Sequence, residues 1–332
     1  MNNIYQDFEQ PFIDGAIKTF KDLCGFETQA EPLQNESDSP EMMVIAGIIG
    51  ITDVNFEGSM VVGFSENGFL ETIEKMLGEK YDHLSAEIED GAAEFANIIF
   101  GQAKLLLNEK NHKIKPAIPS VIRGEELNSP DQVNLISRKL FRLPKGVAFI
   151  EIAGRATKQS QPEPTQEAVI TGPKLDGQVL MSFVDGVRKA LQIQCNMEAE
   201  PMQPFKRADG NYYQFDIGSI IGVTGATFRG TLSIAFEQKA YLELYYRMTN
   251  ERHDFVTSEI ADGASELMNI IYGIAKVKLN EQGHRLQMAL PKLLQGPKME
   301  MRHGSKKPPI AVPFSIEGGK VWVEFAFEDS NE

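Results

Sequence analysis

An internal repeat constrains this 332-residue chain more than any other feature. Residues 87–112 match residues 259–284, which lie 172 positions further on, and sixteen of the twenty-six positions are identical. Asp, Glu, Asn and Lys are among the residues kept, although a hydrophobic core does not require them. The repeat therefore predicts two copies of one domain and two copies of one site, in a chain long enough for two domains of about 150 residues.

The domain boundaries follow from the repeat and from composition. We predict a first domain over residues 1–153, a linker over 154–173 and a second domain over 174–332. The linker range is rich in Gln, Pro, Thr and Glu and has no hydrophobic periodicity. Each half mixes helical periods with hairpin-like strand patterns, which predicts an α+β fold with a mostly antiparallel sheet packed against long helices.

Within each half, alternating residues predict a strand with one buried face. Residues 56–64 and residues 228–236 show this alternation. A helix is expected before each strand pair, at residues 11–23 and about 178–193, and a shorter one after it, at residues 68–77 and 239–248.

The repeated segment itself predicts a long helix, from residue 85 or 86 to about residue 110. Ser85 and its counterpart Thr257 are suitable N-caps. Asn111 and its counterpart Gly283 are the two residue types that best tolerate a left-handed helix end. An unbroken helix of this length would span roughly 39 Å.

One face of this helix is polar in both copies. At 100° per residue, six residues share a strip about 80° wide. We call these two sets the strips: Asp90, Glu94, Asn97, Gly101, Lys104 and Asn108 in the first copy, and Asp262, Glu266, Asn269, Gly273, Lys276 and Asn280 in the second.

A solvated face of an amphipathic helix is the simplest explanation of such a strip, and shared ancestry alone could preserve its residues. However, a solvated face tolerates exchange of polar types, whereas here the types are held while apolar neighbours change. Gly101 and Gly273 each cost about 1 kcal/mol relative to alanine inside a helix. Close approach of a partner surface would explain them.

The strip residues suggest a chemistry. Glu94 and Asn97 are three apart, which places a carboxylate and a carboxamide about 5–6 Å from one another. The carboxylate can accept from a partner's Lys or Arg, and the carboxamide can hold and orient a water molecule. No Ser/His or Cys/His set and no metal-ligand set is apparent, and His112 and His284 are interpreted as capping or core residues.

Net charge, hydropathy and cysteine placement indicate which classes of partner and which cellular compartment to expect. A net charge of −14 disfavours nucleic acid and anionic membranes. The start of the chain has no secretory pattern, and the most apolar run, residues 42–51, is too short to span a membrane. Cys24 and Cys195 occupy equivalent positions, which favours buried free thiols. We expect a cytoplasmic protein.

The repeated motif resembles the signature of the CheC/CheX/FliY phosphatases of bacterial chemotaxis, and CheX most of all. The resemblance rests on Asp90-x3-Glu94-x2-Asn97 with Pro119, and on Asp262-x3-Glu266-x2-Asn269 with Pro291. The segments 48–52 and 220–224 add to it. The resemblance covers most of both halves and implies two tandem CheX-like domains that form a pseudo-dimer on one chain, with a higher assembly left open.

The resemblance also implies an activity, the dephosphorylation of a phospho-aspartate on a CheY-like response regulator. Asn97 and Asn269 would orient the attacking water, and Glu94 and Glu266 would engage the receiver's lysine. This chain would bind no cofactor, since Mg²⁺ would come from the receiver. The remaining strip residues would support partner binding, namely Asp90, Gly101, Lys104, Asp262, Gly273 and Lys276. The alternative is a non-catalytic module that binds a receiver or a flagellar-switch protein.

Overall fold

The computed structural model describes residues 4–33, 42–53, 55–127, 134–157, 177–207 and 213–329. The first half contains α1 (Ile4–Cys24), β1 (Ala30–Pro32), β2 (Ile45–Asp53), β3 (Phe56–Phe64), α2 (Glu66–Leu77), α3 (Asp90–Glu109), β4 (Lys115–Pro116), β5 (Ser120–Arg123), β6 (Leu135–Arg142) and β7 (Val147–Ala156). The second half contains α4 (Gly177–Cys195), β8 (Glu200–Pro201), β9 (Phe205–Lys206), β10 (Phe215–Thr224), β11 (Phe228–Phe236), α5 (Gln238–Thr249), α6 (Ser258–Ala261), α7 (Gly263–Glu281), β12 (Gln287–Met288), β13 (Lys292–His303), β14 (Ile310–Ile316) and β15 (Gly319–Asp329).

The two halves repeat one α+β architecture, as predicted. In the first half the strand order is β1-β6-β7-β3-β2-β5, and in the second it is β13-β10-β11-β15-β14-β8, with every pair antiparallel. The register is also repeated, because Ile45 pairs with Phe64 and, 172 residues on, Ile217 pairs with Phe236. Two copies of one fold are therefore confirmed down to the hydrogen-bond register.

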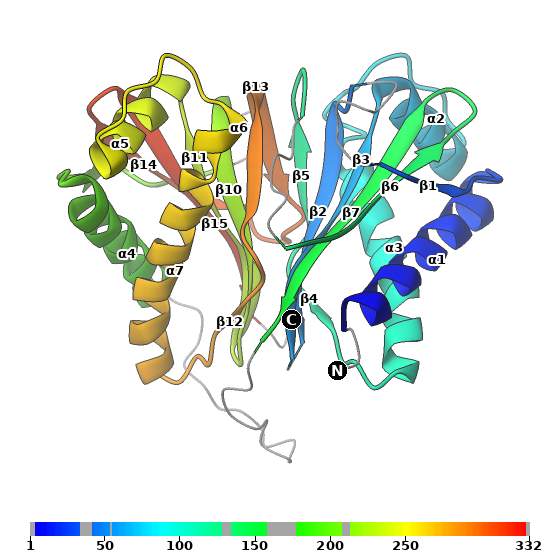
Figure 1. The fold of residues 1–332 in the computed structure, drawn as a ribbon, viewed down its shortest axis with the longest axis horizontal. Helices are drawn as coiled ribbons and strands as arrows, with labels where there is room; N and C mark the ends of the chain where they lie inside the picture. Colours follow the sequence, from blue (N-terminus) through cyan, green and yellow to red (C-terminus); the bar gives the residue numbers. More distant parts are fainter. Residues whose placement is uncertain are drawn as a thin grey trace.

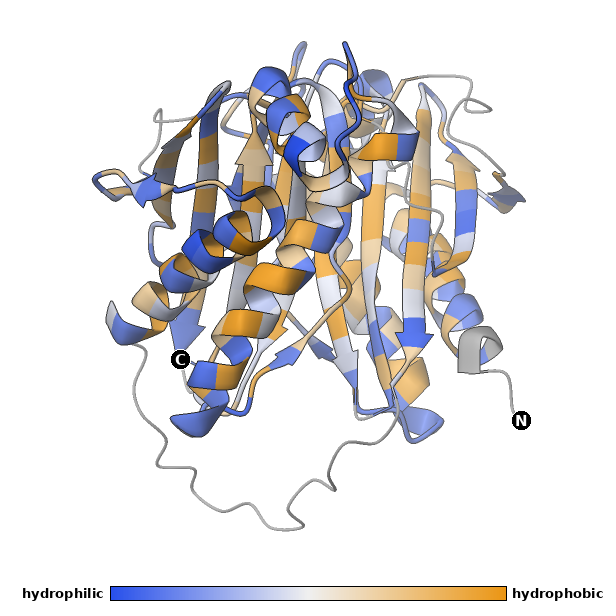
Figure 2. Cartoon of the chain, turned by 60° about the vertical axis from the view of Figure 1, so that its left-hand side comes forward, coloured by the Kyte–Doolittle hydropathy of each residue, from blue (hydrophilic) through white to orange (hydrophobic). Residues whose placement is uncertain are grey.

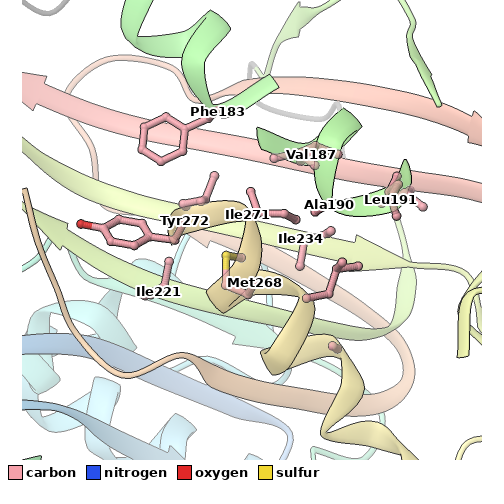
Figure 3. Close-up of a cluster of buried hydrophobic side chains, with 14 of the residues drawn as sticks. Phe183, Val187, Ala190, Leu191, Ile221, Ile234, Met268, Ile271 and Tyr272 are labelled. Carbon is pink, nitrogen blue, oxygen red and sulfur yellow. The ribbon is translucent and has the colours of Figure 1, made fainter. Parts of the chain in front are cut away.

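Helices cover the outer face of each sheet, and the inner faces of the two sheets meet in the middle of the molecule (Figure 1). Hydropathy follows this layering, since the strands are largely hydrophobic and the helices alternate between hydrophobic and hydrophilic residues (Figure 2). Each domain has its own core between helices and sheet. Figure 3 shows the second one, where Phe183 and Val187 of α4, Met268 and Ile271 of α7, and Ile221 of β10 point toward one another.

The prediction that these strands bury only one face was wrong. In β3 and β11 nearly every residue is buried, including Val61 and Ala235 on the faces expected to be exposed. The reason is a third apolar cluster, which joins both domains across the inner faces. It includes Ile48 and Phe149 of the first domain and Trp322 of the second.

Contacts between equivalent residues show that the halves are related by a pseudo-twofold axis. The Thr52 and Thr224 hydroxyls, 172 positions apart, lie 3.0 Å from each other. Gly50 lies against its counterpart Gly222, so closely that a Cβ on Gly50 would be 2.8 Å from the Gly222 Cα. Self-contact of equivalent positions is the mark of an isologous interface. The predicted intramolecular pseudo-dimer is thus what the chain forms.

The interface also contains strand pairing and buried charge. At the domain boundary β5 pairs with β13, with Arg123 opposite Glu300 and Ser120 opposite His303. Between the sheets, Lys292 of the second domain forms an ion pair with Glu151 of the first, and both side chains are fully buried. An ion pair buried in this way favours one arrangement of the two domains, because a shifted packing would leave the Lys292 ammonium buried without its partner.

Two predicted boundaries need correction. β7 continues to Ala156, so residues 154–156 of the predicted linker belong to the sheet, while residues 158–173 of it lie outside the described residues. The long helix does not start at residue 85 or 86. Residues 86–89 form turns before α3, and in the second domain α6 and α7 are separate helices. The α3 segment of 20 residues therefore spans about 30 Å.

The end of the long helix is as predicted. Asn111 has a φ of 66° and Gly283 a φ of 93°, and the following His112 and His284 amides donate back to the Leu107 and Leu279 carbonyls. Ser85 and Thr257 do not cap the long helices. Thr257 precedes only the short helix α6, and its side chain forms no cap hydrogen bond. Cys24 and Cys195 are buried free thiols, as expected.

Candidate functional site

The strips lie on α3 and α7, which pack their apolar sides against the sheets. On α3 the buried residues include Ala92, Phe95, Ala96 and Ile99, at the helical spacing that forms one inward face. This face contacts β2 and α1, and the equivalent face of α7 contacts β10 and α4. Burial of one side leaves the opposite side, with the strip, facing outward.

The six strip positions have the same exposure in both domains. The aspartates, glutamates and glycines and the terminal asparagines are exposed, whereas the central asparagines and the lysines are partly buried. Agreement at each position, on two separately folded helices, shows that the fold presents the strip in one fixed way. The exposed residues are Asp90, Glu94, Gly101 and Asn108 with Asp262, Glu266, Gly273 and Asn280, and the partly buried ones are Asn97 and Lys104 with Asn269 and Lys276.

The central asparagines are the strip residues with the most restricted surroundings. Asn97 and Asn269 are partly buried, one turn from the exposed carboxylates of Glu94 and Glu266. The Asn269 side-chain oxygen is buried and has no hydrogen-bond partner among the groups that the structure describes. An unfilled acceptor in a partly buried amide costs stability and calls for an explanation. A bound water or an incoming group that donates a hydrogen bond would supply one.

The strip glycines differ in their surroundings from the other glycines that lie beyond the first residue of a helix. No atom lies within 4 Å of a Cβ placed on Gly101 or on Gly273. By contrast, a Cβ on Gly186 of α4 would lie 2.8 Å from the Ile271 carbonyl oxygen of α7, so that glycine permits two helices to pack closely. Packing within the chain therefore explains Gly186 but not the strip glycines, and the space above them is open.

Further electrostatic details distinguish the second strip. Partial burial raises the pKa of Asp262 above its ordinary value. The Lys276 ammonium lies 6.0 Å from the centroid of the Tyr272 ring, at the outer limit of a cation–π contact. Asn280 accepts a hydrogen bond of 2.6 Å from the Leu286 amide, so this strip residue stabilises the chain after α7.

The structure keeps the two strips apart. α3 covers the outer face of one sheet and α7 the outer face of the other, on opposite sides of the molecule (Figure 1). Each site is therefore built from one helix of one domain, and the pseudo-twofold axis produces two outward-facing surfaces. The two strips are therefore accessible from opposite sides of the molecule.

The histidines near the sites pack against aromatic rings, in agreement with their interpretation as capping or core residues. The buried His284 has its Nδ1 2.7 Å from the Thr227 hydroxyl, and its ring packs edge-on against Phe228. His112 packs in the same way against Phe8. Pro119 immediately precedes β5, and its counterpart Pro291 precedes β13.

No group of three or more His, Cys, Asp or Glu side chains in the described ranges is arranged to hold a metal ion. Likewise, no helix within those ranges is both long and apolar enough to cross a membrane.

Sequence reasoning missed a charged group at the start of α3. The carboxylate of Glu89 is buried and forms ion pairs with Arg123 and with Arg302. Arg302 belongs to the other domain. The available signal was the departure from the repeat, since the position equivalent to Glu89 is Ala261.

Comparison with known proteins places the chain in a family. The family model described as chemotaxis phosphatase CheX matches residues 45–138 and 217–315, one segment in each domain and together more than half of the chain. No curated protein matches it.

Similar solved structures each match about half of the chain. A CheC-like superfamily protein from Shewanella sp. PV-4 is 30% identical, over 46% of this chain and 99% of that one, with a TM-score of 0.44. The chemotaxis protein CheX from Vibrio vulnificus is 30% identical, over 46% of this chain and 100% of that one, with a TM-score of 0.44. A CheX–CheY–BeF3–Mg complex from Borrelia burgdorferi is 21% identical, over 45% and 97%, with a TM-score of 0.37. With a family match in each of its two domains, the chain belongs to the chemotaxis phosphatase family CheX.

Proposed function

We propose that this protein dephosphorylates the phospho-aspartate of a CheY-like response regulator, with one site on each domain. The observation that carries the proposal is the repeated strip in a CheX family member. In both domains a partly buried asparagine stands one helical turn from an exposed glutamate, on a surface with open space above its glycine.

In the proposed reaction the chain orients the attacking water and supplies no nucleophile of its own. Asn97 and Asn269 each hold the attacking water in line with the phosphorus, through a carboxamide that can both donate and accept. Glu94 and Glu266 accept from the receiver's lysine, and their exposure leaves them free to do so. Water attacks the phosphoryl group, the P–O bond to the aspartyl oxygen breaks, and phosphate and the aspartate carboxylate are released.

Mg²⁺ belongs to the receiver in this scheme. It would neutralise charge on the transferring phosphoryl group, as in other phosphoryl-transfer sites. Each role that we assign to this chain is one of docking or of orienting water.

Recognition of the receiver would rest on short-range fit. The chain carries a net charge of −14, so it gives no general electrostatic attraction to an acidic partner. The remaining strip residues would provide the fit, through the exposed Asp90 and Asp262, the glycines Gly101 and Gly273, and Lys104 and Lys276. Because the second domain takes the place of a second subunit, one chain carries both sites without a further copy.

The test is phosphate release from a phosphorylated CheY receiver in the presence of wild type, Asn97→Ala, Asn269→Ala and the double variant. We expect each single variant to retain one active site, and the double variant to lose on the order of 10²-fold in catalysed rate. Receiver binding should persist in all four proteins, because the substitution removes a water-orienting group and leaves the docking surface in place.

Gln192→Ala is the matched control, since it removes an exposed carboxamide from α4, outside both strips. It should leave the rate unchanged. If the wild type binds phosphorylated receivers without accelerating phosphate loss, the protein is a non-catalytic binding module and the phosphatase proposal fails.

A further inference from the structure

The start of α3 is held by charged residues from both domains. Glu89 directly precedes the first residue of α3, eight positions before Asn97, and its side chain is 3% exposed. Its Oε1 pairs with Arg123 Nη1, and its Oε2 lies 3.0 Å from Arg302 Nε. Arg302 lies on β13 of the second domain, which runs beside β5 in the centre of Figure 1.

Two further contacts complete this group. Arg302 Nη1 donates to the Ala86 carbonyl at 3.0 Å, within the turn that leads into α3. Arg123 Nη2 lies 3.0 Å from Glu300 Oε2, also on β13. The group therefore alternates in charge, with two residues from each domain, and it fixes both the side chain before α3 and the backbone of the preceding turn.

Among the residues that the structure describes, the second domain has no equivalent of this group. The counterpart of Glu89 is Ala261, and the counterpart of Arg123 is Gln295. Gln295 donates to the Val256 carbonyl at 3.1 Å, and the Tyr241 hydroxyl donates to the Ile260 carbonyl. The turn before α7 is thus held by contacts from its own domain.

We propose that Glu89 and Arg302 are positioning residues for the first site alone, so that the second domain controls the first site through a contact that has no reciprocal counterpart among the described residues. The inference rests on the proposed function, and it adds that the two sites are unequal. A carboxylate that is buried and bonded to two guanidinium groups fixes its backbone position. Removal of one partner frees the first turn of α3, which leads directly into the turns that carry Glu94 and Asn97.

The experiment measures each site separately. Arg302→Met and Glu89→Gln are placed in the Asn269→Ala background, where only the first site works, and in the Asn97→Ala background, where only the second works. In the first background we expect kcat to fall about tenfold with KM little changed, since a misplacement of about 1 Å can cost on the order of 10²-fold. In the second background we expect both constants within about twofold of the parent.

A readout that needs no phosphatase activity accompanies the kinetics. Hydrogen exchange of the amides of residues 88–97 should accelerate at least tenfold in Arg302→Met and in Glu89→Gln, while residues 260–269 keep their wild-type rates. Combining the two substitutions should add little, because both break the same ion pair. Arg229→Met is the control, since it removes an arginine that pairs with Glu328, outside this group.

The possible results separate the two proposals. A wild type that accelerates no phosphate loss refutes the proposed function, whatever the exchange rates show. If the wild type is active, three results with the variants would refute the inference. Residues 88–97 could exchange at the wild-type rate in both variants, or the two sites could lose activity equally. Exchange could also accelerate without a fall in kcat at the first site.

Discussion

Replacing the strip glycines by alanine should raise the stability of the protein and weaken its docking to a receiver. Gly101 and Gly273 are exposed within α3 and α7, and no atom lies within 4 Å of an added Cβ. A methyl group at either position meets nothing in the chain. The helix therefore gains the difference in propensity between alanine and glycine, about 1 kcal/mol per site. The two sites are on separate domains, so the double variant should gain about 2 kcal/mol.

The measurement is urea unfolding of each single variant, the double variant and the wild type, followed by titration with a phosphorylated receiver. If a partner closely approaches these helices, the added methyl groups lie in its path. KM for the receiver should then rise several-fold while the protein becomes more stable. A gain in stability with a loss of docking is the signature of a residue kept for function.

The same substitution at Gly186, Gly186→Ala, should lower the stability of the protein instead of raising it. Its Cβ would lie 2.8 Å from the Ile271 carbonyl oxygen, so α4 and α7 must move apart and stability should fall. Two results would refute the reasoning about the strip. A loss of stability in Gly101→Ala and Gly273→Ala would mean that these glycines serve packing, and unchanged docking in the stabilised protein would mean that no partner approaches them closely.

Three further predictions concern the buried groups. Tyr272→Phe should stabilise the protein by about 1 kcal/mol in urea unfolding, because the Tyr272 hydroxyl is buried with no partner among the described groups. The first repeat already carries a phenylalanine, Phe100, at the equivalent position. A loss of stability would mean that the hydroxyl has a hydrogen-bond partner. Burial lowers the pKa of His303 to about 4, so the unfolded chain binds a proton that the folded chain does not between pH 6.5 and 4, and stability should fall by about 3 kcal/mol as the pH drops through that range. His303→Gln should flatten this dependence, and an unaltered pH profile would assign it to other groups. Burial raises the pKa of the Cys24 thiol to about 12 and that of the Cys195 thiol to about 11. Neither thiol should therefore react with a thiol reagent at pH 8 until the chain is unfolded. Rapid labelling of the folded protein would contradict this.

Features that depend on neighbours in the sequence were predictable. The helix ends at Asn111 and Gly283 follow from the ability of those residue types to adopt a positive φ, and both do so. The grouping of the strip residues on one side of a helix follows from the helical period. That Asn97 and Asn269 are the functional centre stays a prediction.

Features that depend on distant segments were not predictable. β13 contains Gly296 and Pro297, which argue against a strand, yet it remains one strand because its first part pairs with β10 and its second part with β5. The exposed-face prediction for β3 failed for a similar reason. Alternation shows that a strand has two faces, but whether the second face meets water or another sheet depends on a partner elsewhere in the chain.

The sequence by itself determined that the chain holds two copies of one helix-borne site, because a repeat and a helical period are visible in the order of residues. Only the tertiary structure decided how the copies differ. Glu89 differs from Ala261 in the sequence, but nothing local shows that Arg302, 213 positions away, completes its ion pairs. Coulombic contacts between side chains act through space, at a distance that the sequence separation does not encode.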